Sequence, residues 1–558
     1  MFRKIVISFI LLLIYTYLFA QNTIGLLSYD LTKVYDGYNL LFPHNQPNVY
    51  LLNNCGEVVH VWEDSSNYRP GNTAYLMEDG RLFKAKREAS ISGDPIWAGG
   101  GGAILEIRDW DNELLWSFKM NDSLNRLHHD FTVTDEGNIL AIAWELKDTE
   151  ACIQAGRDTS TLSQGILWPD WILEIDPELD SIVWEWHAWQ HLIQDFDSTK
   201  SNYSKATNDP HLIDVNYGRS DGHPDWMHAN SIDYNSALDQ ILISVPYFDE
   251  IWIIDHSTTK SQAAGHFGGI GGMGGDLLWR WGNPRAYGAG DSTDQQLFFQ
   301  HDAHWIDDYI STSHSQYGRI AVFNNRVGAD FSAANILTPV WDSYDGGYVM
   351  SNGTFFPSQP SKTIMHPTPT KMYSNILSSV QALDNGNYLL TAGRPGYSFE
   401  LTSSNEVVWE YATPLRAGNP LTQGDSLELN DNFTFRMDRI PVSFAAFKDK
   451  DLTPKGWLEL EPDSTFCDFS LSTVEQFNKT NMQLFPNPVQ DVFSIRWEGN
   501  SQVALEIHNV LGELIKSLVI SEKTVSLSTE GWMPGIYSLS LLDRSNRYTR
   551  KFIVSNLE

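Results

Sequence analysis

Two patterns of apolar and polar positions recur along most of this 558-residue chain. The first consists of an apolar run, a short polar turn and a second apolar run, and the turn often contains an acidic-Gly or Asn-Gly pair. Such turns between apolar runs are typical of β-hairpins. Clear copies lie at residues 73–83, 130–140, 230–242 and 380–390, and a looser copy spans residues 303–323.

The second pattern is an apolar strand that contains or ends in tryptophan. Its copies are Val58–Trp62, Leu114–Phe118, Val183–Trp186 and Val407–Tyr411. Together the two patterns give two hairpins, or four strands, in each unit of roughly 50–70 residues, which is the scale at which propeller blades repeat. The sequence therefore predicts an all-β fold built around a β-propeller.

The spacing of the repeats predicts the number of blades. Starts near residues 73, 130, 230, 303 and 378 give five blades, and segment 38–62 with a stretch near residues 435–460 completes a sixth. Seven blades and two tandem β-sandwiches are the alternatives, and the tryptophan strand shared by the units argues against the sandwiches.

Two segments depart from the repeat. Residues 188–226 lack the pattern and are predicted to form a long insertion. The glycine-rich loop 265–275 has no lysine after it, so that it does not match a phosphate-binding P-loop. Long loops on a rigid scaffold are where function tends to reside.

The N-terminus has a composition of its own. Arg3 and Lys4 precede an apolar run from Ile5 to Ala20, which predicts a secretory signal peptide over residues 1–20. A transmembrane anchor is the alternative, but the run is short for a bilayer, and no later segment is long and apolar enough to span one.

The composition changes again near residue 475, and alternating strands between residues 484 and 554 predict a small C-terminal β-sandwich. The predicted parts are a signal peptide (1–20), a propeller (22–465), a linker (466–481) and a C-terminal domain (482–558).

The chain is strongly acidic. It has 38 Lys and Arg against 70 Asp and Glu, a net charge of −32, which argues against nucleic acid as a partner. An anionic substrate would need a local cluster of positive groups. Three cysteines, Cys55, Cys152 and Cys467, are too few for a disulfide framework, although export would permit one pair.

Several of the 16 histidines stand where the first strand of a predicted blade begins. They are His128 and His129, His228, and His301 with His304. A propeller brings the same position of each blade toward one central channel, so that these side chains would converge in a shared pocket. Hydrogen bonding at a blade edge is the alternative use of any one of them.

A metal site is a competing use of clustered histidines. His301 and His304 with Asp302 offer ligand atoms, but a spacing of three residues on a strand is not a metal signature by itself. We therefore predict no metal and no cofactor.

Six short segments carry a resemblance to a known family: Asp225–Tyr234, Gln300–Ile306, Val322–Arg326, Glu250–His256, Arg280–Pro284 and His129–Phe131. They resemble segments of bacterial arylsulfotransferases, and the resemblance covers roughly residues 25–450. It implies a six-bladed propeller that moves a sulfuryl group from an aryl sulfate to a phenolic acceptor, without a nucleotide donor such as PAPS, through a sulfated histidine.

The resemblance also implies site residues. His228 and His301 match two active-site histidines, and Arg326 matches the active-site arginine. Sulfuryl transfer spreads negative charge over three oxygens, which fixed cationic donors stabilise, and imidazole serves as a nucleophile or acid–base group near neutral pH. We further expect substrate contacts from His129, Asn230 and Asn325.

One departure from the family concerns the nucleophile. The family's sulfate-accepting histidine follows the arginine, but after Arg326 the predicted propeller contains only His366, and residues 373–379 contain no histidine. The nucleophile stays open between His366 by chain order and His301 or His304 by position. A propeller that has lost the reaction and binds a glycan or protein at the cell surface is the alternative function.

The C-terminal segment resembles the sorting domain of the type IX secretion system of Bacteroidetes. The features are Phe-Pro-Asn-Pro at 485–488, Val-Leu-Gly-Glu at 510–513, Pro-Gly-Ile-Tyr at 534–537 and a basic last strand. The resemblance implies the type IX machinery as a partner, passage from the periplasm through the outer membrane, and secretion or attachment at the cell surface.

Overall fold

The computed structural model describes residues 22–219, 221–344, 346–464, 467, 482–497, 503–509, 513–520, 523–543 and 546–555. The predicted signal peptide, nearly all of the predicted linker and residues 510–512 of the tail motif lie outside the described residues. The described residues are mostly β-structure with few helices, and they divide into a large unit that ends at Asp463 and a small unit that begins at Ser464.

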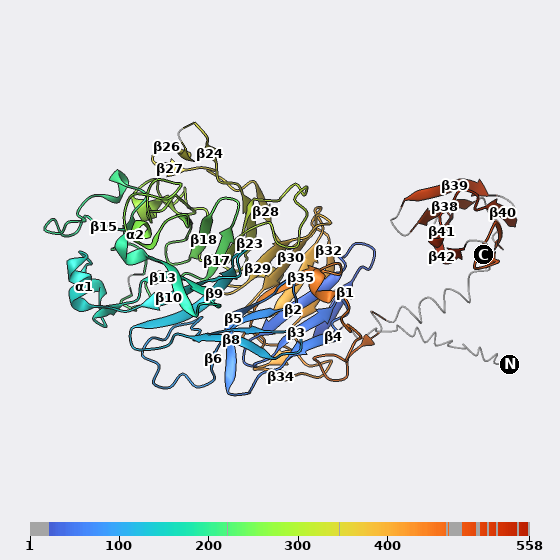
Figure 1. Ribbon diagram of the computed structural model, residues 1–558, viewed down its shortest axis with the longest axis horizontal. Helices are drawn as coiled ribbons and strands as arrows, with labels where there is room; N and C mark the ends of the chain where they lie inside the picture. Colours follow the sequence, from blue (N-terminus) through green and yellow to red (C-terminus); the bar gives the residue numbers. More distant parts are fainter. Residues whose placement is uncertain are drawn as a thin grey trace, which may run out of the picture. The chain divides into compact units, whose positions relative to one another are not determined.

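The large unit contains six antiparallel sheets of four or five strands (Figure 1). The first is β5–β8 (Tyr68–Leu76, Leu82–Glu88, Ile104–Arg108, Leu114–Lys119). The second is β9, β10, β13 and β14 (Asn125–Val133, Ile139–Glu145, Asp170–Asp176, Ser181–His187). The third is β17–β20 (Ser231–Asn235, Gln240–Val245, Glu250–Asp255, Trp279–Trp281). The fourth is β21, β22, β23 and β28 (His301–Trp305, Ile320–Asn324, Ala333–Leu337, Lys362–Ile364).

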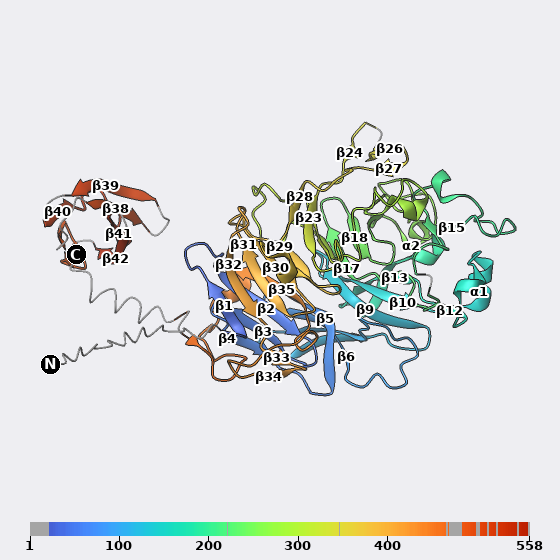
Figure 2. The ribbon, with the colours of Figure 1, turned by 180° about the vertical axis from the view of Figure 1, so that it is seen from behind.

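The last two sheets join the two ends of the unit. The fifth is β29–β32 (Ser379–Ala382, Tyr388–Ala392, Tyr397–Leu401, Val407–Ala412), and β1 (Gly25–Tyr29) pairs with β32 at its edge, as Figure 2 shows. The sixth is β35, β2, β3 and β4 (Thr434–Pro441, Gly37–Pro43, Val49–Asn53, Val58–Trp62). Tyr38 of β2 lies opposite Ile440 of β35, so that N-terminal and C-terminal strands share one sheet.

The first strands of the six sheets form a closed ring. Each of β5, β9, β17, β21, β29 and β35 contacts the next, and β35 contacts β5. The sheets are thus arranged around a common centre, which is a propeller-like architecture.

The repeated tryptophans explain how neighbouring sheets are held together. Trp62, Trp186 and Trp409 are fully buried. The indole N–H of Trp62 donates to the carbonyl of Asp109 in the next sheet at 3.1 Å, and that of Trp409 donates to the carbonyl of Asn54 at 2.8 Å. Each indole therefore contributes a large apolar surface and one specific bond between sheets.

Short elements fill the connections between strands. They are α1 (Thr149–Gln154), α2 (Lys260–Ala263), β11 (Lys147–Asp148), β12 (Ile166–Leu167), β15 (Leu192–Ile193), β16 (Ile213–Asp214), β24 (Trp341–Asp342), β25 (Gly347–Tyr348), β26 (Met350–Ser351), β27 (Thr354–Phe355), β33 (Leu415–Arg416) and β34 (Asn419–Pro420). The 3₁₀ turns are η1 (Thr159–Thr161), η2 (Ala188–Gln190), η3 (Ala206–Asn208), η4 (Pro284–Tyr287), η5 (Pro369–Met372) and η6 (Ala445–Phe447). The predicted insertion 188–226 holds η2, β15, η3 and β16.

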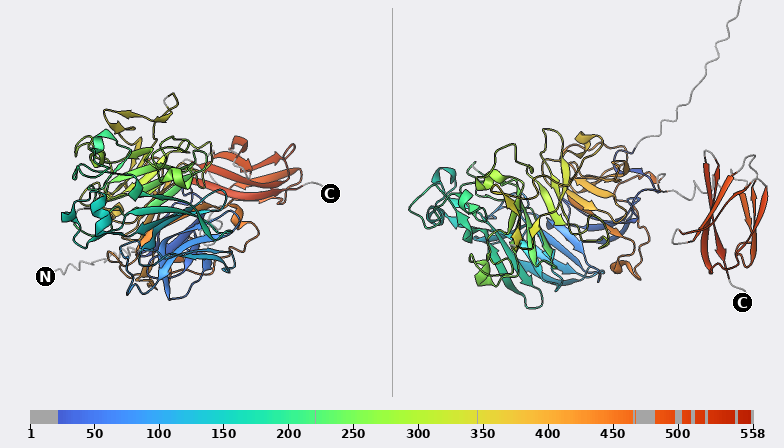
Figure 3. Two further views of the ribbon diagram at one scale, coloured as in Figure 1. Left: turned by 60° about the vertical axis from the view of Figure 1, so that its left-hand side comes forward. Right: turned by 90° about the horizontal axis from the view of Figure 1, so that it is seen from above.

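The small unit has two antiparallel sheets, whose strands the right-hand view of Figure 3 shows. One contains β36, β37 and β40 (Met482–Phe485, Val492–Trp497, Thr524–Ser528), and the other contains β39, β38, β41 and β42 (Leu514–Ile520, Val503–Asn509, Gly535–Asp543, Asn546–Val554). Phe493, Leu505 and Leu539 are buried in a hydrophobic core of its own.

Cys152 is a buried free thiol, whereas Cys55 and Cys467 are disulfide-bonded. Within the described part of the chain, no helix combines the length and the apolar composition that a membrane span requires.

Candidate functional site

Histidines from neighbouring sheets meet at or near the first strands. His129 lies in β9 and His228 lies three residues before β17, and their ring centroids are 4.4 Å apart. Both residues have a positive φ, 52° and 62°, which turns their side chains out of the regular strand direction.

Aromatic contacts continue around this end of the ring. His228 contacts Tyr247 at 5.5 Å between ring centroids, Tyr247 contacts Phe299 at 5.3 Å, and Phe299 contacts His301 at 6.1 Å. We call His129, His228, Tyr247, Phe299 and His301 the histidine face. Because His228, Tyr247 and Phe299 are only partly buried, the face is reachable from solvent.

A buried carboxylate orients His228. Nδ1 of His228 donates to Oδ2 of Asp225 at 2.6 Å, and Asp225 is 1% exposed. Burial alone would raise the pKa of Asp225, but His228 and, more weakly, Arg219 lower it below its usual value, so that the carboxylate is ionised. Nε2 of His228 has no hydrogen-bond partner among the described residues, and its side chain is 13% exposed. This arrangement leaves one imidazole nitrogen free to react.

Two arginines stack on the aromatic rings of the face, and a third shares a partner with one of them. The guanidinium of Arg326 lies 3.5 Å from the ring centre of Phe299, and that of Arg219 lies 4.7 Å from the ring centre of Tyr247. Arg326 donates from Nε to the carbonyl of Asn375 at 3.0 Å, and Arg394 donates to the side-chain oxygen of the same Asn375 at 2.6 Å. Arg326 is exposed, which suits an anionic ligand in an otherwise acidic protein.

His301 lies at the face with both ring nitrogens engaged. Nδ1 is 2.9 Å from Oδ1 of Asn325, and Nε2 accepts from the backbone N–H of Leu377 at 3.1 Å. Because Asn325 uses its amide group to donate to the carbonyls of Ser374 and Leu377, its oxygen is the acceptor for His301. Burial lowers the pKa of His301 to about 3, which keeps the ring neutral. His301 is therefore held in place and has no free ring nitrogen.

His128 supports the face from behind. Its ring stacks on Trp144 at 4.0 Å, and its Nδ1 lies 2.8 Å from Nδ1 of His129. Burial lowers the pKa of His128 and raises the pKa of Asp170, whose Oδ1 lies 3.3 Å from His128 Nε2.

The two asparagines predicted to contact substrate both have structural partners. Asn230 is fully buried and donates to the carbonyl of Gln300 at 2.8 Å, and Asn325 is fully buried in the bonds described above. They connect neighbouring sheets because side-chain amides satisfy buried carbonyls. Of the three predicted substrate contacts, only His129 lies on the histidine face.

His304 and His366, two of the nucleophile candidates, lie elsewhere. Nδ1 of His304 is 3.0 Å from the carbonyl oxygen of Asp302, and the side chain lines a cavity beyond the other end of the first strands. His366 packs against Phe399 at 4.9 Å, and its Nδ1 accepts from the backbone N–H of Thr368 at 2.8 Å. Neither histidine contacts the histidine face among the described residues.

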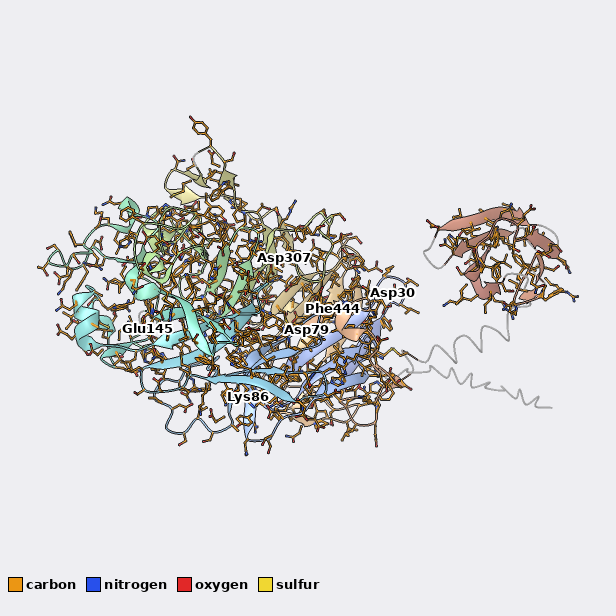
Figure 4. The ribbon with its side chains drawn as sticks, viewed as in Figure 1. Asp30, Asp79, Lys86, Glu145, Asp307 and Phe444 are labelled. Carbon is orange, nitrogen blue, oxygen red and sulfur yellow. The ribbon has the colours of Figure 1, made fainter. Side chains whose placement is uncertain are left out.

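The cavity that His304 lines has a volume of about 780 Å³. Acidic residues that follow the first strands line it, among them Asp307, which Figure 4 labels together with another lining residue, Phe444. Arg436 closes it toward the ring centre, since Nη2 lies 2.7 Å from Asp302 and 3.4 Å from Asp130. The strongly acidic lining does not suit an anionic substrate.

Leu377 lies in the segment 373–379, where the resemblance predicts a histidine that the sequence lacks. It has a positive φ of 60°, like His228, and its backbone N–H bonds to His301. The segment 373–379 therefore supplies backbone groups to the site but no imidazole.

Sequence reasoning missed several residues around the face. Arg219, Tyr247 and Arg394 come from connections with no repeated motif, so that no sequence signal marks them. Asp225 lies three residues before His228, in a segment that carries the resemblance. That spacing is the signal in the sequence that could have identified Asp225 as a site residue. His44, whose pKa burial lowers to about 4, lies close enough to His129 to lower that residue's pKa.

Solved structures that resemble this chain do so weakly. A protein of unknown function from Bacteroides caccae is 11% identical, covers 67% of this chain and 93% of its own, and has a TM-score of 0.37. An inactive virginiamycin B lyase from Staphylococcus aureus, solved with quinupristin, is 8% identical, covers 63% of this chain and 86% of its own, and has a TM-score of 0.29.

Sequence comparisons identify both units. An endo-acting ulvan lyase from Formosa agariphila is 31% identical over 77 residues, which is 13% of this chain and only 15% of that enzyme. Residues 483–555 match the secretion system C-terminal sorting domain, which confirms the resemblance of the tail to a type IX sorting domain and implies secretion to the cell surface or beyond. Residues 39–416, well over half of the chain, match the arylsulfotransferase (ASST) family, and the protein belongs to that family.

Proposed function

We propose that the large unit is a six-bladed β-propeller that moves a sulfuryl group from an aryl sulfate to a phenolic acceptor without a nucleotide donor. Membership of the arylsulfotransferase family supports this class of reaction. Within the site, the Asp225–His228 bond of 2.6 Å carries the proposal, because it orients an imidazole whose second nitrogen is free.

In the first step, the lone pair of His228 Nε2 attacks the sulfur of the donor. The S–O bond to the aromatic ring breaks, and the phenolate leaves with that electron pair and takes a proton from solvent. His228 keeps its Nδ1 proton, and the ionised Asp225 balances the positive charge of the sulfated ring.

In the second step, the hydroxyl oxygen of the acceptor attacks the same sulfur. The N–S bond breaks, its electron pair returns to His228 Nε2, and the acceptor's proton passes to solvent. The product is a new aryl sulfate, and the histidine is restored for the next cycle.

Negative charge on the sulfuryl oxygens would be stabilised by Arg326 and Arg219. Both guanidiniums are stacked on aromatic rings of the histidine face, which fixes their position before the reaction. Tyr247 and Phe299 offer apolar ring surfaces against which a substrate's aromatic ring packs favourably.

His129 and His301 have supporting roles in this proposal. Burial, His228 and His128 hold the pKa of His129 well below its usual value, so that a neutral ring stands beside the sulfated His228. His301 fixes the loop at Leu377 next to Arg326. The expected sites of action are the cell surface and the exterior, reached through the periplasm and the outer membrane with the type IX machinery as partner.

The test is turnover of p-nitrophenyl sulfate with phenol as acceptor. We expect nitrophenolate release that depends on phenol in the parent protein and is lost in His228→Ala. His366→Ala is the matched control, because His366 is a buried histidine outside the face, and it should retain the parent rate. Equal activity of the parent and His228→Ala would contradict the proposal.

A non-catalytic binding protein is the second candidate, and one observation favours it. The segment 373–379, in which the family's accepting histidine is expected, contains no histidine, and the N–H of its Leu377 occupies a ring nitrogen of His301. Under this reading the arginines and aromatic rings of the face bind a glycan or protein partner without reaction. Absence of turnover in the parent protein, with measurable binding of an aryl sulfate, would support this second candidate.

A further inference from the structure

A second group of histidines lies outside the histidine face. His191, His266 and Asp276 each offer one ligand atom, and these atoms lie within 4.8 Å of one another. His191 follows the outermost strand β14 of the second sheet, His266 lies in the glycine-rich loop 265–275, and Asp276 directly follows that loop. Among the described residues, this group has no hydrogen bond or ring contact with the histidine face.

His191 is oriented as metal-binding histidines usually are. Its Nε2 is 2.8 Å from the carbonyl oxygen of Ala263, at the end of α2, so that this nitrogen carries the proton and donates it. The neutral ring then directs the lone pair of Nδ1 at Oδ1 of Asp276, 2.8 Å away. Two lone pairs at that distance repel each other unless a cation or a proton stands between them. Metal-binding histidines commonly donate their other ring N–H to a backbone carbonyl, which fixes the tautomer of the ligand.

His266 completes the group from the solvent side. Its Nδ1 lies 2.8 Å from Oδ1 and 3.0 Å from Oδ2 of Asp276. His191 is fully buried, while the side chain of His266 is 51% exposed. The group is therefore buried on the side of His191 and exposed to solvent on the side of His266.

The surrounding structure holds these groups in place. A Cβ at Gly275 would lie 2.0 Å from the Ala263 carbonyl oxygen and 2.6 Å from Nε2 of His191, so that only glycine permits their approach. Trp186 stacks on His191 at an interplanar angle of 3°, and its indole N–H donates to the carbonyl of Gly275 at 2.7 Å. The glycines of this loop thus allow Asp276 and His266 to lie against His191.

We infer that His191, His266 and Asp276 bind a divalent transition metal ion of the zinc class. Two imidazole nitrogens and one carboxylate oxygen suit Zn²⁺ and its neighbours rather than Mg²⁺ or Ca²⁺, which prefer oxygen ligands. The ion replaces the shared protons and joins the loop 265–275 to the edge of the second sheet. This site is independent of sulfuryl transfer.

An ion-free alternative exists and is distinguishable. A doubly protonated His191 would donate to both Ala263 and Asp276, which satisfies the same distances with a charge-assisted hydrogen bond. In that case the chelated protein would neither take up metal at this site nor gain stability from it.

In the experiment, the full, untagged chain is treated with a chelator and then titrated with metal. Binding of Co²⁺ is monitored by visible absorption, and binding of Zn²⁺ is monitored by the amount of bound metal and by thermal unfolding. We expect one ion per chain, a cobalt spectrum of low coordination number, and a higher melting temperature with metal. His266→Ala and Asp276→Asn should weaken binding at least about tenfold.

His314→Ala is the matched control, because it removes a partly exposed histidine outside the group. It should bind metal as the parent does. Absence of bound metal in the parent, or unchanged affinity in both His266→Ala and Asp276→Asn, would overturn the inference. Neither result bears on turnover of aryl sulfates, which tests the proposed function separately.

Discussion

Asp225→Asn is the substitution that tests the catalytic pair with the least change in shape. The carboxylate is 1% exposed and accepts the Nδ1 proton of His228 at 2.6 Å, a short charge-assisted bond. An amide of the same size can offer its N–H₂ to Nδ1, which favours the tautomer with the proton on Nε2. The nitrogen that should attack sulfur then has no lone pair available, and the balancing negative charge is lost.

The expected loss is large because two effects add. The equivalent isosteric change in a Ser-His-Asp triad lowers kcat by about 10⁴, and we expect a fall of about 10³–10⁴-fold here. The assay is release of nitrophenolate from p-nitrophenyl sulfate with phenol, measured beside a thermal melt that shows the variant is folded.

Asp221→Asn provides the control for this change. Asp221 is an exposed partner of Arg219 at 2.8 Å, so that its replacement alters the charge around Arg219 without touching His228. We expect that variant to stay within a few-fold of the parent. If folded Asp225→Asn remains within about tenfold of the parent, the assignment of His228 as nucleophile is refuted.

Three further predictions concern charge, packing and pH. Arg326→Ala should lower the rate of sulfuryl transfer by on the order of a hundredfold or more. The melting temperature should not change, because Arg326 is exposed and its loss leaves the core intact. Activity equal to that of the parent would contradict its role. Gly100→Ala should lower the free energy of unfolding by about 1–3 kcal/mol more than Gly137→Ala does. Both glycines have a positive φ, but only a Cβ at Gly100 would clash with His129, at 2.0 Å from its Nε2. Equal free energies of unfolding for the two variants would contradict this packing. Burial raises the pKa of Asp438 to about 7, whereas an unfolded aspartate titrates near 4, so that between these values only the folded state holds the proton and stability should fall as pH rises from about 4 to about 7. Urea unfolding of Asp438→Asn should show a shallower fall over this range, and an unchanged slope would contradict the assignment.

Much of the fold can be predicted from the sequence because each repeat has a physical reason. The tryptophan strands are recognisable since Trp62, Trp186 and Trp409 each bury an indole at a sheet boundary. Strands β9, β17 and β29 begin within about five residues of the predicted starts, because hairpin turns fix the register of the pair that follows. The pairing of β35 with β2 was also predictable, since segment 38–62 lacks a first strand of its own.

The candidate site was only partly predictable. His129, His228 and His301 stand at equivalent positions of successive sheets, and the structure brings them to one face. His304 is three residues farther along an extended strand, about 10 Å, which carries it to the other end of the ring. Arg219 reaches the face from an insertion, and long-range contacts of that kind leave no periodic signal in a single sequence.

The most direct test of the account is the location of the sulfuryl group on the enzyme. The protein is incubated with p-nitrophenyl sulfate without acceptor, digested under neutral conditions, and its peptides are examined by mass spectrometry. We expect one added sulfuryl group on the peptide that contains His228, absent from His228→Ala and removed when phenol is added. A sulfuryl group on His366 or His301 instead, or none on an enzyme that turns over, would contradict it.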